Sequence, residues 1–194
     1  MELGKLAVVR SGLVLKRKES KSNNGIAYPL LNLKSFREDA VLQKDSLDTF
    51  FASEKLDQSY LTQCGDIVVR LSFPYTAVLI DSTTEGIVIS SNFVVIRINT
   101  ETILSEYLYW LLNSEAIKKD ISKNVSTNAL GTVRPQYYNN LKIHLLPIDQ
   151  QKTIATIHQL SRKETYLLKK LIEEKERYYT ELLRDIDKEM RNIK

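Results

Sequence analysis

A segment of about 45 residues, from Gln150 to Lys194, contains neither glycine nor proline. At about 1.5 Å per residue, a helix of that length is roughly 65 Å long. Apolar residues recur along it in steps of mostly three and four, beginning with Ile154, Ile157 and Leu160. The remaining positions are mainly Lys, Arg and Glu. This spacing predicts one long amphipathic helix.

The apolar stripe of this helix predicts an intermolecular interface. A domain of ~150 residues is only roughly 35 Å across, so it cannot cover the whole stripe. Self-association as a coiled coil is the simplest way to cover the far end. The residues expected at this interface are Leu160, Leu167, Leu171, Tyr178, Leu182, Ile186 and Met190. The alternative is a helix folded back as a hairpin, although no breaker marks a turn.

The first 148 residues read as one globular domain with both strands and helices. Runs rich in β-branched residues predict strands at 65–73 and 76–81, and a longer strand at 87–98. Apolar spacing predicts a helix over 102–122. The expected fold is therefore α+β: a mixed domain with a twisted sheet over 1–148, then a long helical region over 149–194.

The boundary between the two regions is the stretch LKIHLLPIDQQ, residues 141–151. It predicts a final strand that ends at Pro147, because proline cannot donate to a sheet ladder. Asp149 is expected to be the N-cap of the long helix, which would begin near Gln150. The residues before this stretch, 123–140, are polar and rich in turn formers, so we expect a loop there.

The charge of the chain is unevenly distributed. The net charge is +4 and the isoelectric point about 9.0. Residues 1–37 carry eight basic and two acidic side chains, whereas residues 38–66 carry two basic and seven acidic ones. A basic face built partly from the first segment is plausible, and it mildly favours a polyanionic partner such as nucleic acid.

Three polar loops offer side chains suited to DNA, although a merely solvated loop is the alternative for each. Flexible cations hold phosphates, Arg pairs with guanine, and Asn or Gln pairs with adenine. The residues expected mainly at phosphates are Lys16, Arg17, Lys18 and Lys21. Those expected near bases are Asn23, Asn24, Lys34, Arg37, Arg70, Ser72, Thr127, Asn128 and Arg134, and the loop after Arg70 also offers Tyr75.

Signatures of catalysis are missing from the sequence. It contains no P-loop, G-x-S-x-G or G-x-G-x-x-G motif. His144 and His158 lack a Cys or His neighbour at metal-ligand spacing. The stretch SFPY at 72–75 departs from the Asn/Asp-Pro-Pro-aromatic motif of amino-methyltransferases at its first two positions. We therefore expect neither enzymatic activity nor a metal site in this chain.

The expected location is the cytoplasm. The single cysteine, Cys64, allows no internal disulfide and suits a reducing compartment. No run of residues is long and apolar enough to cross a bilayer. Lys5 and Arg10 interrupt the N-terminal stretch, which is therefore not expected to be a signal peptide.

Six sequence stretches follow one another in a characteristic order along the chain. They run from LGKLAVVRSG through GIAYPLLNLKSF, CGDIVVRLSFPYTAVLID, GIVISSNFVVIRI and LSEYLYWLLNS to NALGTVRPQYYNNLKIHLLPIDQQKTIATI. This order of motifs resembles half of a type I restriction-modification specificity (S) subunit. The pattern L-x-I-x-x-L-P-x-x-x-Q ahead of the long helix is the most specific part. The resemblance spans nearly the whole chain, although each motif by itself is loose.

The resemblance implies a role in selecting a DNA site. A full-length S subunit has two target-recognition domains and two helical regions, and this chain has room for one of each. Two copies would pair through antiparallel helices, hold their heads at a fixed distance and read a bipartite palindromic site. They would recruit methyltransferase subunits, which carry S-adenosylmethionine, and a restriction subunit as a further partner. No cofactor is expected in this chain.

Two other functions remain open at this point. The chain could be a decoy half-subunit that competes for the methyltransferase and so blocks restriction. It could also be a dimeric scaffold whose globular domain binds another protein and never contacts DNA.

Overall fold

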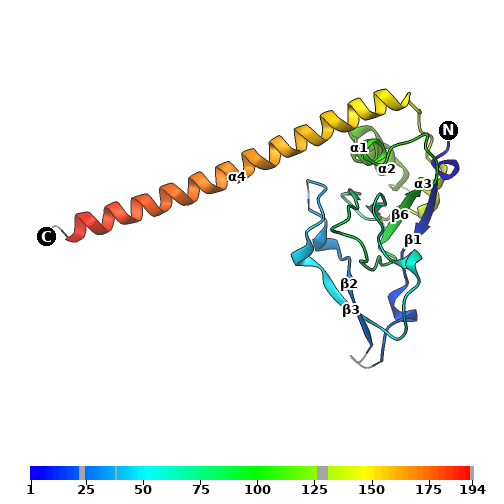
Figure 1. The fold of residues 1–194 in the computed structure, drawn as a ribbon, viewed down its shortest axis with the longest axis horizontal. Coiled ribbons are helices and arrows are strands. Elements are labelled where there is room, and N and C mark those ends of the chain that lie inside the picture. Colours follow the sequence, from blue (N-terminus) through cyan, green and yellow to red (C-terminus); the bar gives the residue numbers. More distant parts are fainter. Residues whose placement is uncertain (22–24, 38, 126–130, 193–194) are drawn as a thin grey trace. The chain divides into compact units, whose positions relative to one another are not determined.

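The computed structural model describes residues 1–21, 25–37, 39–125 and 131–192. Two compact units emerge, Met1–Ala155 and Thr156–Lys194, and each is described by itself. Figure 1 shows the elements of the first unit and the long helix α4. The order of strands and helices confirms the predicted α+β fold with a sheet and a long C-terminal helix, and strand pairing shows that the sheet is antiparallel.

A four-stranded antiparallel sheet forms the centre of the first unit. Its strands are β1 (Ala7–Ser11), β6 (Phe93–Ile98), β4 (Ile67–Arg70) and β5 (Ala77–Leu79), in that spatial order. Strand β6 therefore lies between β1 and β4 and pairs with both. The central strands are apolar at nearly every position because both faces of the sheet are covered.

Each face of the sheet supports its own hydrophobic core. On one face, Ile67, Val69, Val94 and Ile96 pack against helices. These helices are α1 (Ser105–Asn113), α2 (Glu115–Val125) and α3 (Pro135–Asn140). On the other face, Val68 and its neighbours pack against loop residues that include Phe36, whose ring stacks on Phe93 with centroids 4.8 Å apart.

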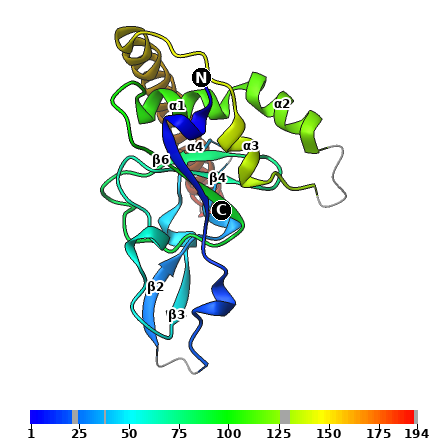
Figure 2. The same cartoon turned by 90° about the vertical axis from the view of Figure 1, so that its right-hand side faces the viewer.

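A separate two-stranded antiparallel sheet joins β2 (Ile26–Leu30) to β3 (Asp48–Ala52). Phe50 and Ala52 are buried in a third apolar cluster beneath it. Short 3₁₀ turns connect these elements, at Leu3–Lys5, Leu15–Arg17, Leu33–Ser35, Lys44–Ser46 and Gln58–Tyr60. In Figure 2 the pair extends away from the central sheet.

Several predicted elements differ in the structure. The helix expected over 102–122 is two helices, because Ser114 is extended (ψ 149°) and ends α1. The strand expected over 87–98 begins only at Phe93, since Val88 bonds to Pro29 and Leu31 instead. The strand expected at 141–148 is a single bridge between Lys142 and Glu2, because its backbone pairs only with the first three residues.

The long helix α4 spans Ile148–Asn192. It begins two residues earlier than predicted, so Asp149 lies in its first turn and the N-cap prediction is wrong. The backbone NH groups of Gln150 and Gln151 both donate to the carbonyl of Pro147, 3.0 and 3.1 Å away. Among the described helices, none is long and apolar enough to span a membrane.

Candidate nucleic-acid interface

The first group of predicted contact residues lies beside the β2–β3 pair. The segment that follows the turn at Leu15–Arg17 runs along β3: Ser20 NH donates to Phe51 O (2.8 Å) and Ser53 NH to Lys18 O (2.8 Å). This pairing fixes the backbone of the segment beside the β2–β3 pair (Figure 2). The side chains of Lys16, Arg17 and Lys21 are exposed, whereas Lys18 is half-buried. Lys16, Arg17 and Lys21 have no acidic partner among the described residues.

Lys18 differs from its neighbours because its ammonium group forms a salt bridge with Glu54. The hydrogen bond to Glu54, followed by the charge of that carboxylate, holds the pKa of Lys18 above its ordinary value. The same contact holds the pKa of Glu54 below its ordinary value. Both groups stay charged at neutral pH, so Glu54 competes with any phosphate for this lysine.

A second group forms where β4 ends. Arg70 donates from Nε to Ser72 Oγ, 3.0 Å away. Ser72 pairs with Thr132 in an isolated bridge, and Val133 NH donates to Leu71 O (2.8 Å). The structure thus brings the loop after β4 alongside the segment that carries Arg134. Arg134 is exposed immediately before α3, with Pro135 in the first position of that helix.

Tyr75 is placed differently from the rest of its loop. Its side chain is only 5% exposed and belongs to the core beneath the helices. Its hydroxyl donates to Gly131 O, 3.4 Å away, and its backbone has a positive φ of 56°. This placement argues against the predicted DNA contact and gives Tyr75 a packing role, because a buried ring cannot reach a base.

Phe73, which is not among the predicted contact residues, is exposed at the tip of the same loop. Its side chain is 75% exposed, and its ring meets the ring of Tyr75 edge to face, 6.1 Å between centroids. A large apolar side chain held beside Arg70 and Ser72 is suited to contact a thymine methyl group. Its signal in the sequence is a phenylalanine directly before Pro74, at the point where the β-branched run ends.

A third group follows β2. Lys34 is exposed in the turn Leu33–Ser35, which Asn32 caps by accepting from Ser35 NH (2.9 Å). Arg37 pairs with Asp39 at 3.2 Å, so its charge is already compensated. Four further predicted contact residues, Asn23, Asn24, Thr127 and Asn128, lie outside the described residues.

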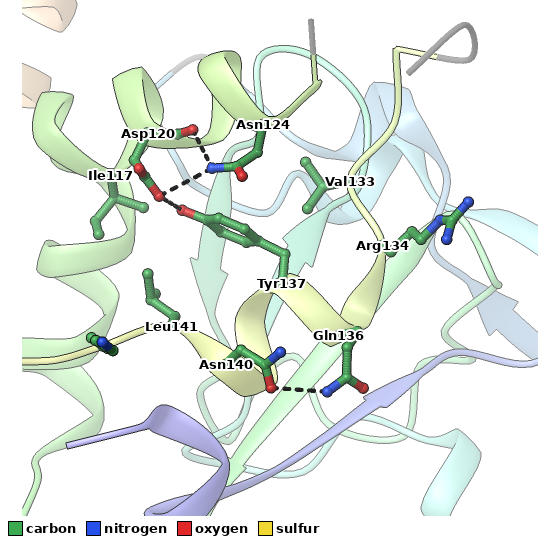
Figure 3. A pocket seen from close by; sticks show the side chains of 10 residues that line it. Ile117, Asp120, Asn124, Val133, Arg134, Gln136, Tyr137, Asn140 and Leu141 are labelled. Atoms are coloured by element: carbon green, nitrogen blue, oxygen red, sulfur yellow. Dashed lines mark hydrogen bonds between the residues drawn. The ribbon is translucent and has the colours of Figure 1, made fainter. Parts of the chain in front are cut away.

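A hollow of about 750 Å³ lies between α2 and α3, close to Arg134 (Figure 3). The hydroxyl of Tyr137 donates to Asp120 at 2.6 Å. Burial, reinforced by this hydrogen bond, raises the pKa of Tyr137, so the phenol keeps its proton. No group of three His, Cys, Asp or Glu side chains that could hold a metal ion occurs in the described part of the chain.

One buried side chain fastens the first turns of α4 to the globular unit. Gln151 is completely buried. Its amide nitrogen donates to Thr102 O (2.9 Å) and Leu146 O (2.8 Å), and its amide oxygen accepts from Leu104 NH (2.9 Å). The glutamine that ends the L-x-I-x-x-L-P-x-x-x-Q pattern therefore has a structural role. Its side-chain amide suits this position because it supplies both a hydrogen-bond donor and an acceptor.

The predicted dimerisation residues are all exposed in the second unit. Leu160, Leu167, Leu171, Tyr178, Leu182, Ile186 and Met190 are between 38% and 67% exposed. Leu168, Ile172, Tyr179 and Leu183 are exposed as well, although the predicted stripe omitted them. The apolar surface of α4 is thus wider than predicted.

Three solved structures from type I restriction-modification systems share the fold of this chain. One of them comes from a study of complex assembly and conformational transition of the type I R-M system. It has a TM-score of 0.65 and 18% sequence identity, and the match covers 86% of this chain and 43% of that chain. Another is the HsdS subunit from Thermoanaerobacter tengcongensis, with a TM-score of 0.63, 17% identity and coverage of 88% and 43%.

A third similar structure is the type I S subunit from M. genitalium, with a TM-score of 0.51, 12% identity and coverage of 84% and 39%. This chain therefore spans less than half the length of the specificity subunits that it matches. No family model and no curated protein matches it. The predicted resemblance is confirmed at the level of the fold.

Proposed function

We propose that this chain is the sequence-specific DNA-recognition subunit of a type I restriction-modification system. The observation that carries the proposal is the shared fold, which covers 86% and 88% of the chain in two S-subunit structures. The exposed cations on loops of the globular unit support it, because phosphate neutralisation supplies most of the affinity for DNA.

Lys16, Arg17 and Lys21 are assigned to phosphates in this proposal. Each is exposed and has no acidic partner among the described residues. Arg70, Ser72 and Arg134 are assigned to base edges, since the structure holds their segments together and bidentate arginine contacts discriminate guanine. Phe73 joins this second group as an apolar contact.

Two copies of the chain pair through α4 and present two identical heads to DNA. A symmetric dimer reads inverted half-sites, so its target is an interrupted palindrome. The paired helices set the distance between the half-sites. Their remaining surface binds methyltransferase subunits in the cytoplasm. The methyltransferase carries S-adenosylmethionine and performs the chemistry, and this chain contributes none.

Co-expression with a type I methyltransferase subunit, followed by methylome sequencing, tests the proposal. We expect a new bipartite methylated motif with two inverted halves. A motif with two unrelated halves would contradict the symmetric dimer. Co-purification of the methyltransferase without any new methylated motif would instead support a decoy, and neither co-purification nor methylation would favour the scaffold.

A further inference from the structure

The described part of α4 contains an internal repeat of 11 residues. Residues 156–166 read TIHQLSRKETY, residues 167–177 read LLKKLIEEKER and residues 178–188 read YYTELLRDIDK. The second position of the repeat is apolar each time, at Ile157, Leu168, Tyr179 and Met190. The fifth is leucine each time, at Leu160, Leu171 and Leu182. All seven side chains are exposed in the single chain.

A repeat of 11 residues keeps these positions on one face of a nearly straight helix. Eleven residues make three turns at about 3.67 residues per turn, close to the 3.6 of an ideal helix. A 7-residue repeat would instead require a left-handed supercoil. The centre of the apolar face therefore lies between the second and fifth positions, which adds Leu168 and Tyr179 to the residues that need a partner.

Two charged residues of opposite sign interrupt the centre of this face. Glu164 and Lys175 occupy the ninth position of successive repeats, where the next repeat has Ile186. They lie roughly 16 Å apart on one helix at about 1.5 Å per residue, so they cannot pair within a chain. Neither has an ion-pair partner among the described residues. A charge within an apolar interface is costly unless it meets its opposite.

We propose that α4 pairs with the α4 of a second copy in an antiparallel register centred between Lys169 and Lys170. This register places Glu164 beside Lys175 of the second copy, and the two-fold axis forms this pair twice. The inference rests on the dimer of the proposed function. A parallel, in-register pair would set Glu164 against Glu164 and Lys175 against Lys175, which repel each other.

The same register also satisfies the apolar positions. It places Leu168 against Leu171, Leu160 against Tyr179 and Ile157 against Leu182 of the second copy. In these three pairs a second-position residue meets a fifth-position leucine, whereas Met190 lies near the end of the overlap, opposite Asp149. A competing antiparallel register, centred on Lys175, also matches apolar positions but brings the two Lys175 side chains together. The charged pair therefore selects one register, as single polar residues do in coiled-coil seams.

Charge reversal tests the pair. In the full chain, Glu164→Lys and Lys175→Glu should each weaken the dimer by about tenfold or more, because two attractive pairs become repulsive. The double variant Glu164→Lys/Lys175→Glu should restore wild-type dimerisation, and a mixture of the two single variants should form heterodimers. Analytical ultracentrifugation measures the dissociation constants, and circular dichroism checks that helicity is unchanged. A Glu164→Lys dimer as tight as wild type would overturn the register.

Cysteine cross-linking tests the register independently. In a Cys64→Ser background, a Leu168→Cys chain mixed with a Leu171→Cys chain should form an intermolecular disulfide on mild oxidation. A Leu168→Cys chain mixed with a Leu182→Cys chain is the matched control and should not, because that pair meets only in the register centred on Lys175. If only the control pair cross-linked, the proposed register would be wrong, although the chain would still be a dimer. If the chain were monomeric at all concentrations, the dimer of the proposed function would be wrong as well.

Discussion

At the scale of single residues, Gln151 places one buried amide among three backbone groups of the globular unit. Gln151→Ala leaves Leu104 NH and two carbonyls without their partner, so we expect a loss of about 2–4 kcal/mol in the free energy of unfolding. Urea denaturation of the full chain, at one fixed protein concentration, measures it. The exposed neighbour Gln150 supplies the control: Gln150→Ala should change stability by less than about 0.5 kcal/mol. Equal effects of the two variants would contradict the fastening role.

The basic segment of the first group offers a second prediction at this scale. Lys16→Ala should weaken binding to all DNA sequences and reduce the salt slope of log K by about 1, because one phosphate contact is lost. Glu54→Gln should act in the opposite direction, since it releases Lys18 from its salt bridge and removes a negative charge. Fluorescence anisotropy at several salt concentrations measures both. A Lys16→Ala variant that changed only the sequence preference would show that Lys16 contacts a base.

At the scale of elements, the sequence predicted what depends on local pattern. The β-branched runs at 67–70 and 93–98 form the centre of the sheet, and the uninterrupted stretch after Pro147 forms one helix. Strand β3 was missed because its residues, DTFFA, are short and lie in an acidic stretch, so only pairing with β2 makes them a strand. Helix α3 was missed because its six residues are polar, although Tyr138 is completely buried.

In the candidate interface too, features that depend on local sequence could be predicted, whereas features that depend on distant residues could not. The exposure of Lys16 and Arg17 follows from a run of cations in a polar segment. The salt bridge between Lys18 and Glu54 joins residues 36 positions apart, so no local pattern reveals it. The burial of Tyr75 likewise depends on a core assembled from distant helices. Sequence thus identified the segments, and the fold decided which of their side chains are available.

At the scale of the whole molecule, the proposed register makes the length of α4 before Glu164 the determinant of the distance between two heads. A second copy of residues 153–163, inserted after Lys163, adds one 11-residue repeat and keeps the apolar face continuous. Each head moves outward by roughly 16 Å, so the separation grows by about 33 Å, close to the roughly 34–36 Å of one DNA turn. We expect the methylated motif to keep both halves and to gain about 10 base pairs of spacer, as read by methylome sequencing.

A five-residue insertion at the same place is the control for this lengthening. It adds only about 15 Å between the heads and rotates each by roughly 140° about its helix, which turns the two heads away from a common face of the DNA. Methylation of every bipartite site should then be lost, whereas each head should keep its half-site affinity in a binding assay. If the 11-residue insertion left the spacer of the methylated motif unchanged, the helix would not set the distance between the half-sites. The heads would then reach their half-sites independently of the length of the helix.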